Sequence, residues 1–126
     1  MTHTQISSGS PFEAIMGYSR AIVAGNMIYV AGTSGFADGQ IADDVVDQTE
    51  TAFKTIAAAL AKAGSSLDDA VRVAVYLTDV TYFEKVAPVL GKHLMTSKPA
   101  NSTVIVAALV DPRMKVEIEI TAIKQG

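Results

Sequence analysis

The sequence predicts an α+β fold in which two helices cover one face of a mixed sheet, and three observations lead to this class. Runs rich in β-branched residues alternate with two helical patterns in the order ββαβαββ, which suits a sheet with helices on one side. The 126 residues, 49% of them hydrophobic, are enough for one hydrophobic core. No internal repeat or low-complexity tract interrupts the pattern, so we expect residues 1–126 to form a single domain.

The chain is expected to begin with a loose segment followed by a hairpin. Residues 1–13 are small and polar and predict a loosely ordered lead-in. Two β-prone runs, 19–24 and 27–32, flank the turn signal Gly25-Asn26, which indicates a β-hairpin. Residues 33–40 contain further glycines and are expected to form a loop.

Two helices are expected in the middle of the chain. The first spans Asp43 to Ala63, where apolar residues recur with helical spacing, acidic residues gather at the start, and Gly64 follows the end. The second is expected to begin at Thr81-Tyr-Phe-Glu84, which has the pattern of a capping box. Pro88 falls beyond its first turn, where proline removes a backbone hydrogen bond, so we expect a kink or an early end there.

Further strands complete the predicted sheet. One is expected at 71–77, and a closing pair at 102–109 and 115–122 is joined by a turn-like connector. In the last strand polar and apolar residues alternate, so one face is predicted to be core and the other polar. The polar face carries Lys115, Glu117, Glu119 and Thr121.

The sheet face away from the helices is too apolar to be fully exposed. Ile22, Tyr29, Val75 and Ile105 fall in both phases of their strands, so both faces of the sheet receive apolar side chains. A sheet with helices on one side and a partly apolar second face usually needs a partner, and we therefore expect an oligomer.

Composition and motifs exclude several classes of site. The chain has no cysteine, which rules out disulfides, thiolate zinc sites and a cysteine nucleophile. Its net charge of −3 and lack of a Lys/Arg cluster argue against a nucleic-acid partner. No apolar run approaches the roughly 20 residues needed to cross a bilayer, so we expect a soluble, cytoplasmic protein without a membrane partner. His3 and His93 lack carboxylates at metal-ligand spacing, so no metal site is expected.

Two acidic residues are candidates for proton transfer. Glu117 and Glu119 point to the same side of one strand, flanked by apolar residues. Burial of either side chain at an interface would raise its pKa and make it a usable donor or acceptor near neutral pH. The alternative is a pair of solvated edge carboxylates, or an intersubunit pairing with Lys115 or Arg113, since exposed glutamate is common on strands.

Tyr18 and Arg20 form a second candidate pair, because they alternate onto one face of the first hairpin strand. A guanidinium beside a hydroxyl suits the recognition of a carboxylate. The alternative is a structural ion pair between Arg20 and Glu117 or Asp111.

Taken in order, six segments of the chain resemble the RidA (YjgF-type) family of reactive-intermediate deaminases, in one register from about residue 14 to residue 123. They are Gly17-Tyr-Ser-Arg-Ala-Ile, Gly25-Asn-Met-Ile-Tyr-Val-Ala-Gly, the helix with Gln48-Thr, Val75-Tyr-Leu-Thr-Asp79, Pro99-Ala-Asn-Ser and Val116-Glu-Ile-Glu119. The resemblance implies a chorismate-mutase-like fold and a homotrimer whose sheets face inward. It also implies small-molecule clefts between subunits and a cofactor-independent hydrolysis of enamines and imines, such as 2-aminoacrylate, to keto acids and ammonia. The family has also been labelled as a ribonuclease, which the acidic composition of this chain makes unattractive.

The resemblance assigns roles to several residues. Glu119 matches the family glutamate that orients or polarises the attacking water, and Tyr18 matches the family tyrosine of the site. Gly32 matches the glycine of the second strand, and Ala31 stands where a serine is common. The family proline before Tyr18 is Gly17 in this chain.

The main departure from the family pattern is Asn101, which stands where deaminating members carry the arginine that grips the substrate carboxylate. Thr103 replaces a common cysteine. Asparagine offers two donors but no charge, so a substrate other than 2-aminoacrylate is expected. Arg20 stands where most members have glutamine and is expected to supply part of the missing charge, unless it forms a structural pair. The alternative function is a non-catalytic trimer that binds a small metabolite.

Overall fold

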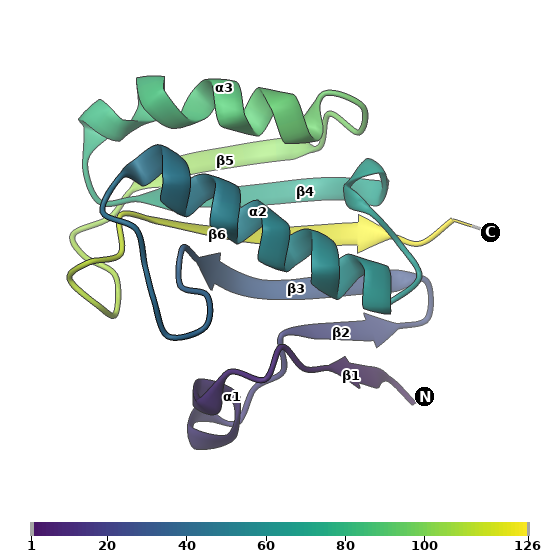
Figure 1. The fold of residues 1–126 in the computed structure, drawn as a ribbon. Helices are drawn as coiled ribbons and strands as arrows, with labels where there is room; N and C mark the ends of the chain where they lie inside the picture. The colour runs from purple at the N-terminus through teal and green to yellow at the C-terminus, as the bar shows by residue number, and fades with distance from the viewer. Residues whose placement is uncertain (1, 126) are drawn as a thin grey trace.

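The structure, a computed structural model, describes residues 2–125 and forms one six-stranded sheet in the order β1-β2-β3-β6-β4-β5 (Figure 1). The strands are β1 (Thr4–Ile6), β2 (Ala21–Ala24), β3 (Met27–Ser34), β4 (Ala70–Leu77), β5 (Ala100–Ile105) and β6 (Val116–Ile123). The helices are α1 (Pro11–Met16), α2 (Val45–Lys62) and α3 (Phe83–Leu94), with 3-10 turns η1 (Leu67–Asp69) and η2 (Val80–Tyr82). Strands β4 and β5 are parallel and the other pairs are antiparallel, so the predicted α+β class with a mixed sheet is confirmed.

The core lies between one face of the sheet and the helices α2 and α3, which Figure 1 draws on the same side. Alternate residues of β6 are buried, as the alternation in its sequence predicts. Phe53 of α2 and Ile118 of β6 are both fully buried, and removing such a side chain from water contributes roughly 1.5–3 kcal/mol. No helix in residues 2–125 is long and apolar enough to cross a membrane.

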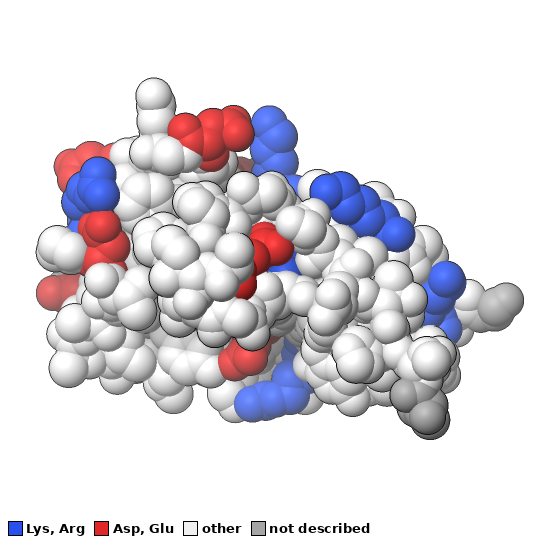
Figure 2. Space-filling view, turned by 90° about the horizontal axis from the view of Figure 1, so that it is seen from below, with Lys and Arg blue, Asp and Glu red and all other residues white. Residues whose placement is uncertain are grey.

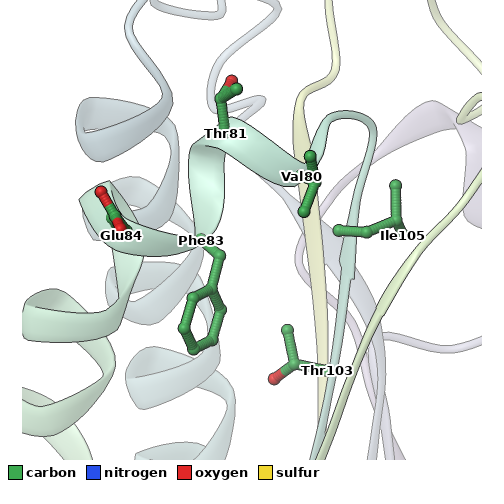
Figure 3. Close-up of a pocket in the computed structure, with 6 residues that line it drawn as sticks. All are labelled: Val80, Thr81, Phe83, Glu84, Thr103 and Ile105. Carbon is green, nitrogen blue, oxygen red and sulfur yellow. The ribbon is translucent and has the colours of Figure 1, made fainter.

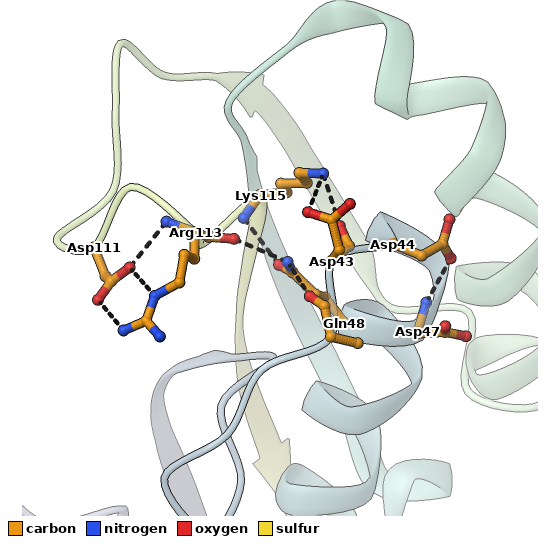
Figure 4. A network of polar contacts seen from close by, with 8 residues as sticks. Asp43, Asp44, Asp47, Gln48, Asp111, Arg113 and Lys115 are labelled. Atoms are coloured by element: carbon orange, nitrogen blue, oxygen red, sulfur yellow. Dashed lines mark hydrogen bonds and ion pairs between the residues drawn. The ribbon is translucent and has the colours of Figure 1, made fainter.

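Gln48 fixes the loop between β5 and β6 against the start of α2 (Figure 4). This fully buried side chain donates from Nε2 to the carbonyls of Ala42 and Arg113, at 2.8 and 2.9 Å, and accepts from the backbone N–H of Lys115 at 2.9 Å. All polar atoms of the amide group therefore have partners, which is what allows it to be buried. The same contacts hold the loop that leads into β6 and Glu119.

The first 13 residues are more ordered than the sequence predicts. Residues 4–6 form β1, which pairs with β2 and places Ile6 in the core. Ser10 caps α1 and Pro11 occupies its first turn, a start signal that could have been read. Strand β1 escapes prediction because three residues are too few for a periodic pattern, and its order comes from pairing with the sheet edge.

The second predicted helix starts and ends differently from expectation. The side chain of Asp79, and not that of Thr81, caps the turn that precedes α3, accepting from the Thr81 N–H at 2.8 Å. Pro88 lies inside α3, which continues to Leu94. Pro88 and Glu84 are both exposed, so water can satisfy the Glu84 carbonyl that loses its hydrogen bond.

The expected loop and the expected closing strand pair also need correction. Strand β3 extends to Ser34, with a bulge between Val30 and Thr33, so the loop begins later than residue 33. Strand β5 ends at Ile105 and pairs with β4, and β4 separates it from β6. Consecutive strands β5 and β6 are therefore not neighbours, because β5 pairs in parallel with β4 and lies at the sheet edge.

Candidate functional site

The predicted site residues lie on two faces of the sheet. Asn101 and Thr103 are paired in register with the buried Val73 and Val75 of β4, so their side chains project toward the helix side at the β5 edge. Glu119 pairs with Ala74 and projects toward the opposite face, which α2 and α3 leave uncovered; we call it the open face. The structure thus separates two groups of residues that the resemblance assigns to one site.

On the helix side of β5, Thr103 borders an open hollow of about 530 Å³ (Figure 3). Thr103 and Ile105 project into it from β5, and Val80 and Phe83 from the turn and helix that follow β4. Thr103 Oγ1 donates to Asn101 Oδ1 at 2.8 Å, which turns the NH₂ group of Asn101 outward as a donor. The hollow beside Thr103 thus has apolar side chains, two hydroxyl-bearing residues and one carboxylate, that of Glu84, in its wall.

A cation also lies near Asn101. Lys98 and Asn101 both border a second, mainly apolar hollow of about 310 Å³ beside the C-terminal end of α3. Lys98 has a left-handed backbone with φ of 46°. The sequence analysis missed it, although its place three residues before Asn101 was visible.

On the open face, Glu119 is held by a tyrosine from the neighbouring strand. Tyr76 Oη donates to Glu119 Oε1 at 2.5 Å. The bond to the carboxylate and partial burial together raise the pKa of the Tyr76 phenol above its ordinary value. Tyr76 was not singled out from the sequence, because only the pairing of β4 with β6 brings it to Glu119.

Arg20 is buried, with 7% of its surface exposed; its Nη1 and Nη2 groups are hydrogen-bonded, whereas its buried Nε has no partner among residues 2–125. It donates to the Gly32 carbonyl and to Thr33 Oγ1, both at 2.9 Å, and to Tyr18 Oη at 3.2 Å. The alternative ion pairs of Arg20 with Glu117 or Asp111 are not found among residues 2–125, and the Asp111 carboxylate pairs with Arg113 instead. The observed contacts make Arg20 a residue that orients the Tyr18 hydroxyl and holds the β3 bulge.

Glu117 lies against the bulge on the same face. Burial raises the pKa of its carboxyl group, although the charge of Arg20 acts in the opposite direction. A Cβ atom on Gly32 would lie 3.0 Å from the Glu117 carboxyl carbon, so a larger residue there would displace the end of the Glu117 side chain. Next to Gly32, the Ala31 N–H donates to the Arg20 carbonyl at 2.9 Å.

Figure 2 shows the molecule from below, with an acidic group beside basic atoms in a hollow near the centre and mostly uncharged surface around it. This face therefore offers a small charged centre within a mostly uncharged surface, which suits a small ligand better than a polyanion.

A family model described as Endoribonuclease L-PSP matches residues 8–124. The chain belongs to the YjgF/RidA family. A crystal structure of Rv2704 from Mycobacterium tuberculosis, described as a YjgF/YER057c/UK114 family member, superposes with a TM-score of 0.89. It is 40% identical, and the match covers 97% of this chain and 99% of that one.

Two sequence relatives in eukaryotes match over most of this chain. Protein MMF1, mitochondrial, from Saccharomyces cerevisiae is 32% identical over 127 residues, covering 99% of this chain and 87% of that protein. Reactive Intermediate Deaminase A, chloroplastic, from Arabidopsis thaliana is 32% identical over 108 residues, covering 83% of this chain and 57% of that protein. The family that the sequence resembles is thereby confirmed for this YjgF/RidA protein.

Proposed function

We propose that this protein is a homotrimer that hydrolyses a small imine or enamine in clefts between neighbouring copies. The division of the predicted site is the observation that carries this proposal. Asn101 and Thr103 project to the helix side of β5, whereas Glu119 projects to the open face two strands away. One copy cannot bring these groups to the same ligand, but the β5 edge of one copy against the open face of the next can.

The relative named Reactive Intermediate Deaminase A supports the reaction class. In the proposed reaction Glu119 accepts a proton from water as the water oxygen adds to the imine carbon and the C=N electron pair moves to nitrogen. The proton passes to that nitrogen. A second transfer, from the new hydroxyl group to nitrogen, releases ammonia and leaves the carbonyl product. Each step uses water and side chains, with no cofactor.

The remaining residues orient the substrate in this proposal. The Tyr18 hydroxyl, held by Arg20, hydrogen-bonds to the substrate, and the backbone around Ala31 and Gly32 forms the adjacent wall. One hypothesis from the sequence was that Arg20 supplies part of the charge of the missing family arginine, but its burial and the hydrogen bonds of Nη1 and Nη2 favour an indirect role. It therefore acts through Tyr18 and the bulge.

Asn101 sets the substrate class. Its outward NH₂ group suits a carbonyl, amide or hydroxyl oxygen, and it lacks the charge that pairs with a carboxylate. A charge-assisted hydrogen bond contributes roughly 1.5–3 kcal/mol, so 2-iminopropionate, the imine form of 2-aminoacrylate, is a poor substrate by about 10- to 100-fold.

A non-catalytic, ligand-binding trimer is the second candidate, and the neutral side chain at position 101 is the observation that favours it. Loss of the positive charge of the family arginine is compatible with a cleft that still binds a ligand but no longer catalyses hydrolysis. We also propose a cytoplasmic location for this chain. The yeast relative MMF1 is named as a mitochondrial protein.

The test compares hydrolysis of 2-iminopropionate, generated by an amino-acid oxidase, with that of an uncharged imine of similar size. We expect the wild type to prefer the uncharged imine, Asn101→Arg to reverse the preference, and Glu119→Gln to abolish both activities. A wild type that prefers 2-iminopropionate would overturn the assigned substrate class. Binding of the uncharged carbonyl product without hydrolysis of either imine would favour the non-catalytic trimer.

A further inference from the structure

The Glu119 carboxylate has one oxygen engaged and one available. Tyr76 Oη donates to Oε1 at 2.5 Å, and no other side-chain hydrogen bond to Glu119 is found among residues 2–125. A glutamate side chain has several rotatable bonds, and fixing it in one orientation costs conformational entropy. A donor anchored on the next strand removes that freedom before a ligand arrives.

Strand register explains why Tyr76 is suited to this task. Tyr76 lies directly opposite Glu117 and Ala74 lies opposite Glu119, so the phenol reaches diagonally across the β4–β6 pair to Glu119. Long aromatic side chains span this diagonal separation. The ring stays fixed because its backbone belongs to a central strand with neighbours on both sides.

The surrounding charges keep the phenol protonated. Glu119 and Glu117 face it from β6 and disfavour the phenolate, whereas Arg72, on its own strand, acts in the opposite direction with a smaller effect. Arg20 reaches this face next to Glu117. Tyr76 is therefore a hydrogen-bond donor, and not a competing base, across the pH range in which an imine hydrolase works.

We propose that Tyr76 is a positioning residue that locks Glu119 through Oε1, so that Oε2 alone is presented to the attacking water. The pairing itself follows from the geometry, and its catalytic use rests on the proposed function. Tyr76 touches neither water nor substrate in this role. The expected consequence is a turnover that depends on the phenol hydroxyl while substrate affinity does not.

The pairing is tested without any substrate by titrating Tyr76. Ultraviolet absorbance of tyrosinate is followed with pH, and subtracting the same titration of a matched Tyr76→Phe variant isolates this phenol from the other tyrosines. We expect Glu119→Gln to lower the Tyr76 pKa, and Glu117→Gln to lower it less, because only Glu119 accepts its hydrogen bond. An unchanged Tyr76 pKa in Glu119→Gln, in protein shown by circular dichroism to be folded, would overturn the proposal.

The catalytic consequence is tested with the uncharged imine. Tyr76→Phe is expected to lower kcat about 5- to 10-fold with KM unchanged, the size of one lost hydrogen bond. Tyr82→Phe is the control, because Tyr82 lies in η2 and packs against the core, away from Glu119, and its loss of a hydroxyl group is expected to leave kcat unchanged. An unchanged kcat in Tyr76→Phe would refute the positioning role. If the wild type hydrolyses no imine, the proposed function fails while the titration still tests the Tyr76–Glu119 pair.

Discussion

At the scale of single residues, Gly35 has no room for a side chain. A Cβ atom at this position would lie 2.6 Å from the Cβ atom of Gln48 and 2.7 Å from its Cα atom. Gln48 cannot move aside, because its amide group holds three backbone groups. The loop after β3 and the first turn of α2 therefore touch through a glycine.

Substituting Gly35→Ala is expected to lower the free energy of unfolding by about 1–3 kcal/mol, the usual cost of overpacking. Gly91→Ala is the matched control: Gly91 lies in α3, a Cβ atom there meets no heavy atom within 4 Å, and alanine is the better helix former by roughly 0.5–1 kcal/mol. Urea denaturation of both variants measures the difference. Equal effects in the two variants would show that Gly35 is not sterically required.

The placement of single residues could be predicted from sequence only where the residues lie on the same strand. The shared polar face of Glu117 and Glu119 follows from the alternation within β6. The bond from Tyr76 to Glu119 joins residues 43 positions apart, so it depends on strand order, which the local pattern does not contain. The contacts of Arg20 with Thr33 likewise depend on the bulge in β3.

At the scale of elements, a cluster on Glu50 joins the outer sides of α2 and α3. His93 Nε2 lies 2.6 Å from Glu50 Oε1, and Lys92 pairs with the other carboxylate oxygen. The His93 ring stacks on Phe53, with centroids 4.4 Å apart. The hydrogen bond from His93 and that from Lys92 lower the pKa of the Glu50 carboxyl group.

A lowered folded-state pKa means that the ionised carboxylate stabilises the fold above its ordinary pKa of 4.5, and that this contribution is lost as the pH falls through the lower folded value. The cluster is solvent-screened, so Glu50→Gln is expected to cost up to about 1 kcal/mol at neutral pH and much less at about pH 3. Urea denaturation at both pH values, at one protein concentration, measures it. Asp68→Asn, which removes an acidic group without an ion pair, is the control; a loss that does not depend on pH would contradict the prediction.

Elements were predictable where periodicity or a strong turn signal marks them. The hairpin of β2 and β3 and the whole of α2 match the expectation closely. Helix α3 was predicted, but its passage through Pro88 was not, because exposure of the freed carbonyl depends on which side of the helix faces water. The parallel pairing of β5 with β4 was not predicted, because η2 and α3 separate the two strands in the sequence.

At the scale of the whole molecule, the apolar surface and the divided site lead to the same proposal. Val104 and Ile105 of the β5 edge and Tyr29 of the open face are about half exposed, although large and apolar. We propose that these side chains are covered by neighbouring copies in the assembly. The apolar residues on both sheet faces predicted a partner. The residues that each face contributes to the site could be assigned only from the strand order of the sheet.

The last prediction concerns the assembly itself. Val104 lies opposite Tyr76 in the sheet, at 46% exposure, so its side chain faces the open side at the β5 edge, where neighbouring copies are proposed to meet. Val104→Lys would bury a charge in that interface, and light scattering coupled to gel filtration is expected to show one chain where the wild type shows three.

Lys54→Glu, on the exposed side of α2, is the charge-changing control and is expected to remain trimeric. Because each proposed cleft takes residues from two copies, the monomeric variant should also lose imine hydrolysis while its circular dichroism spectrum stays that of a folded chain. A trimer that persists in Val104→Lys, or a monomeric wild type, would remove the shared cleft and with it the function proposed for Glu119.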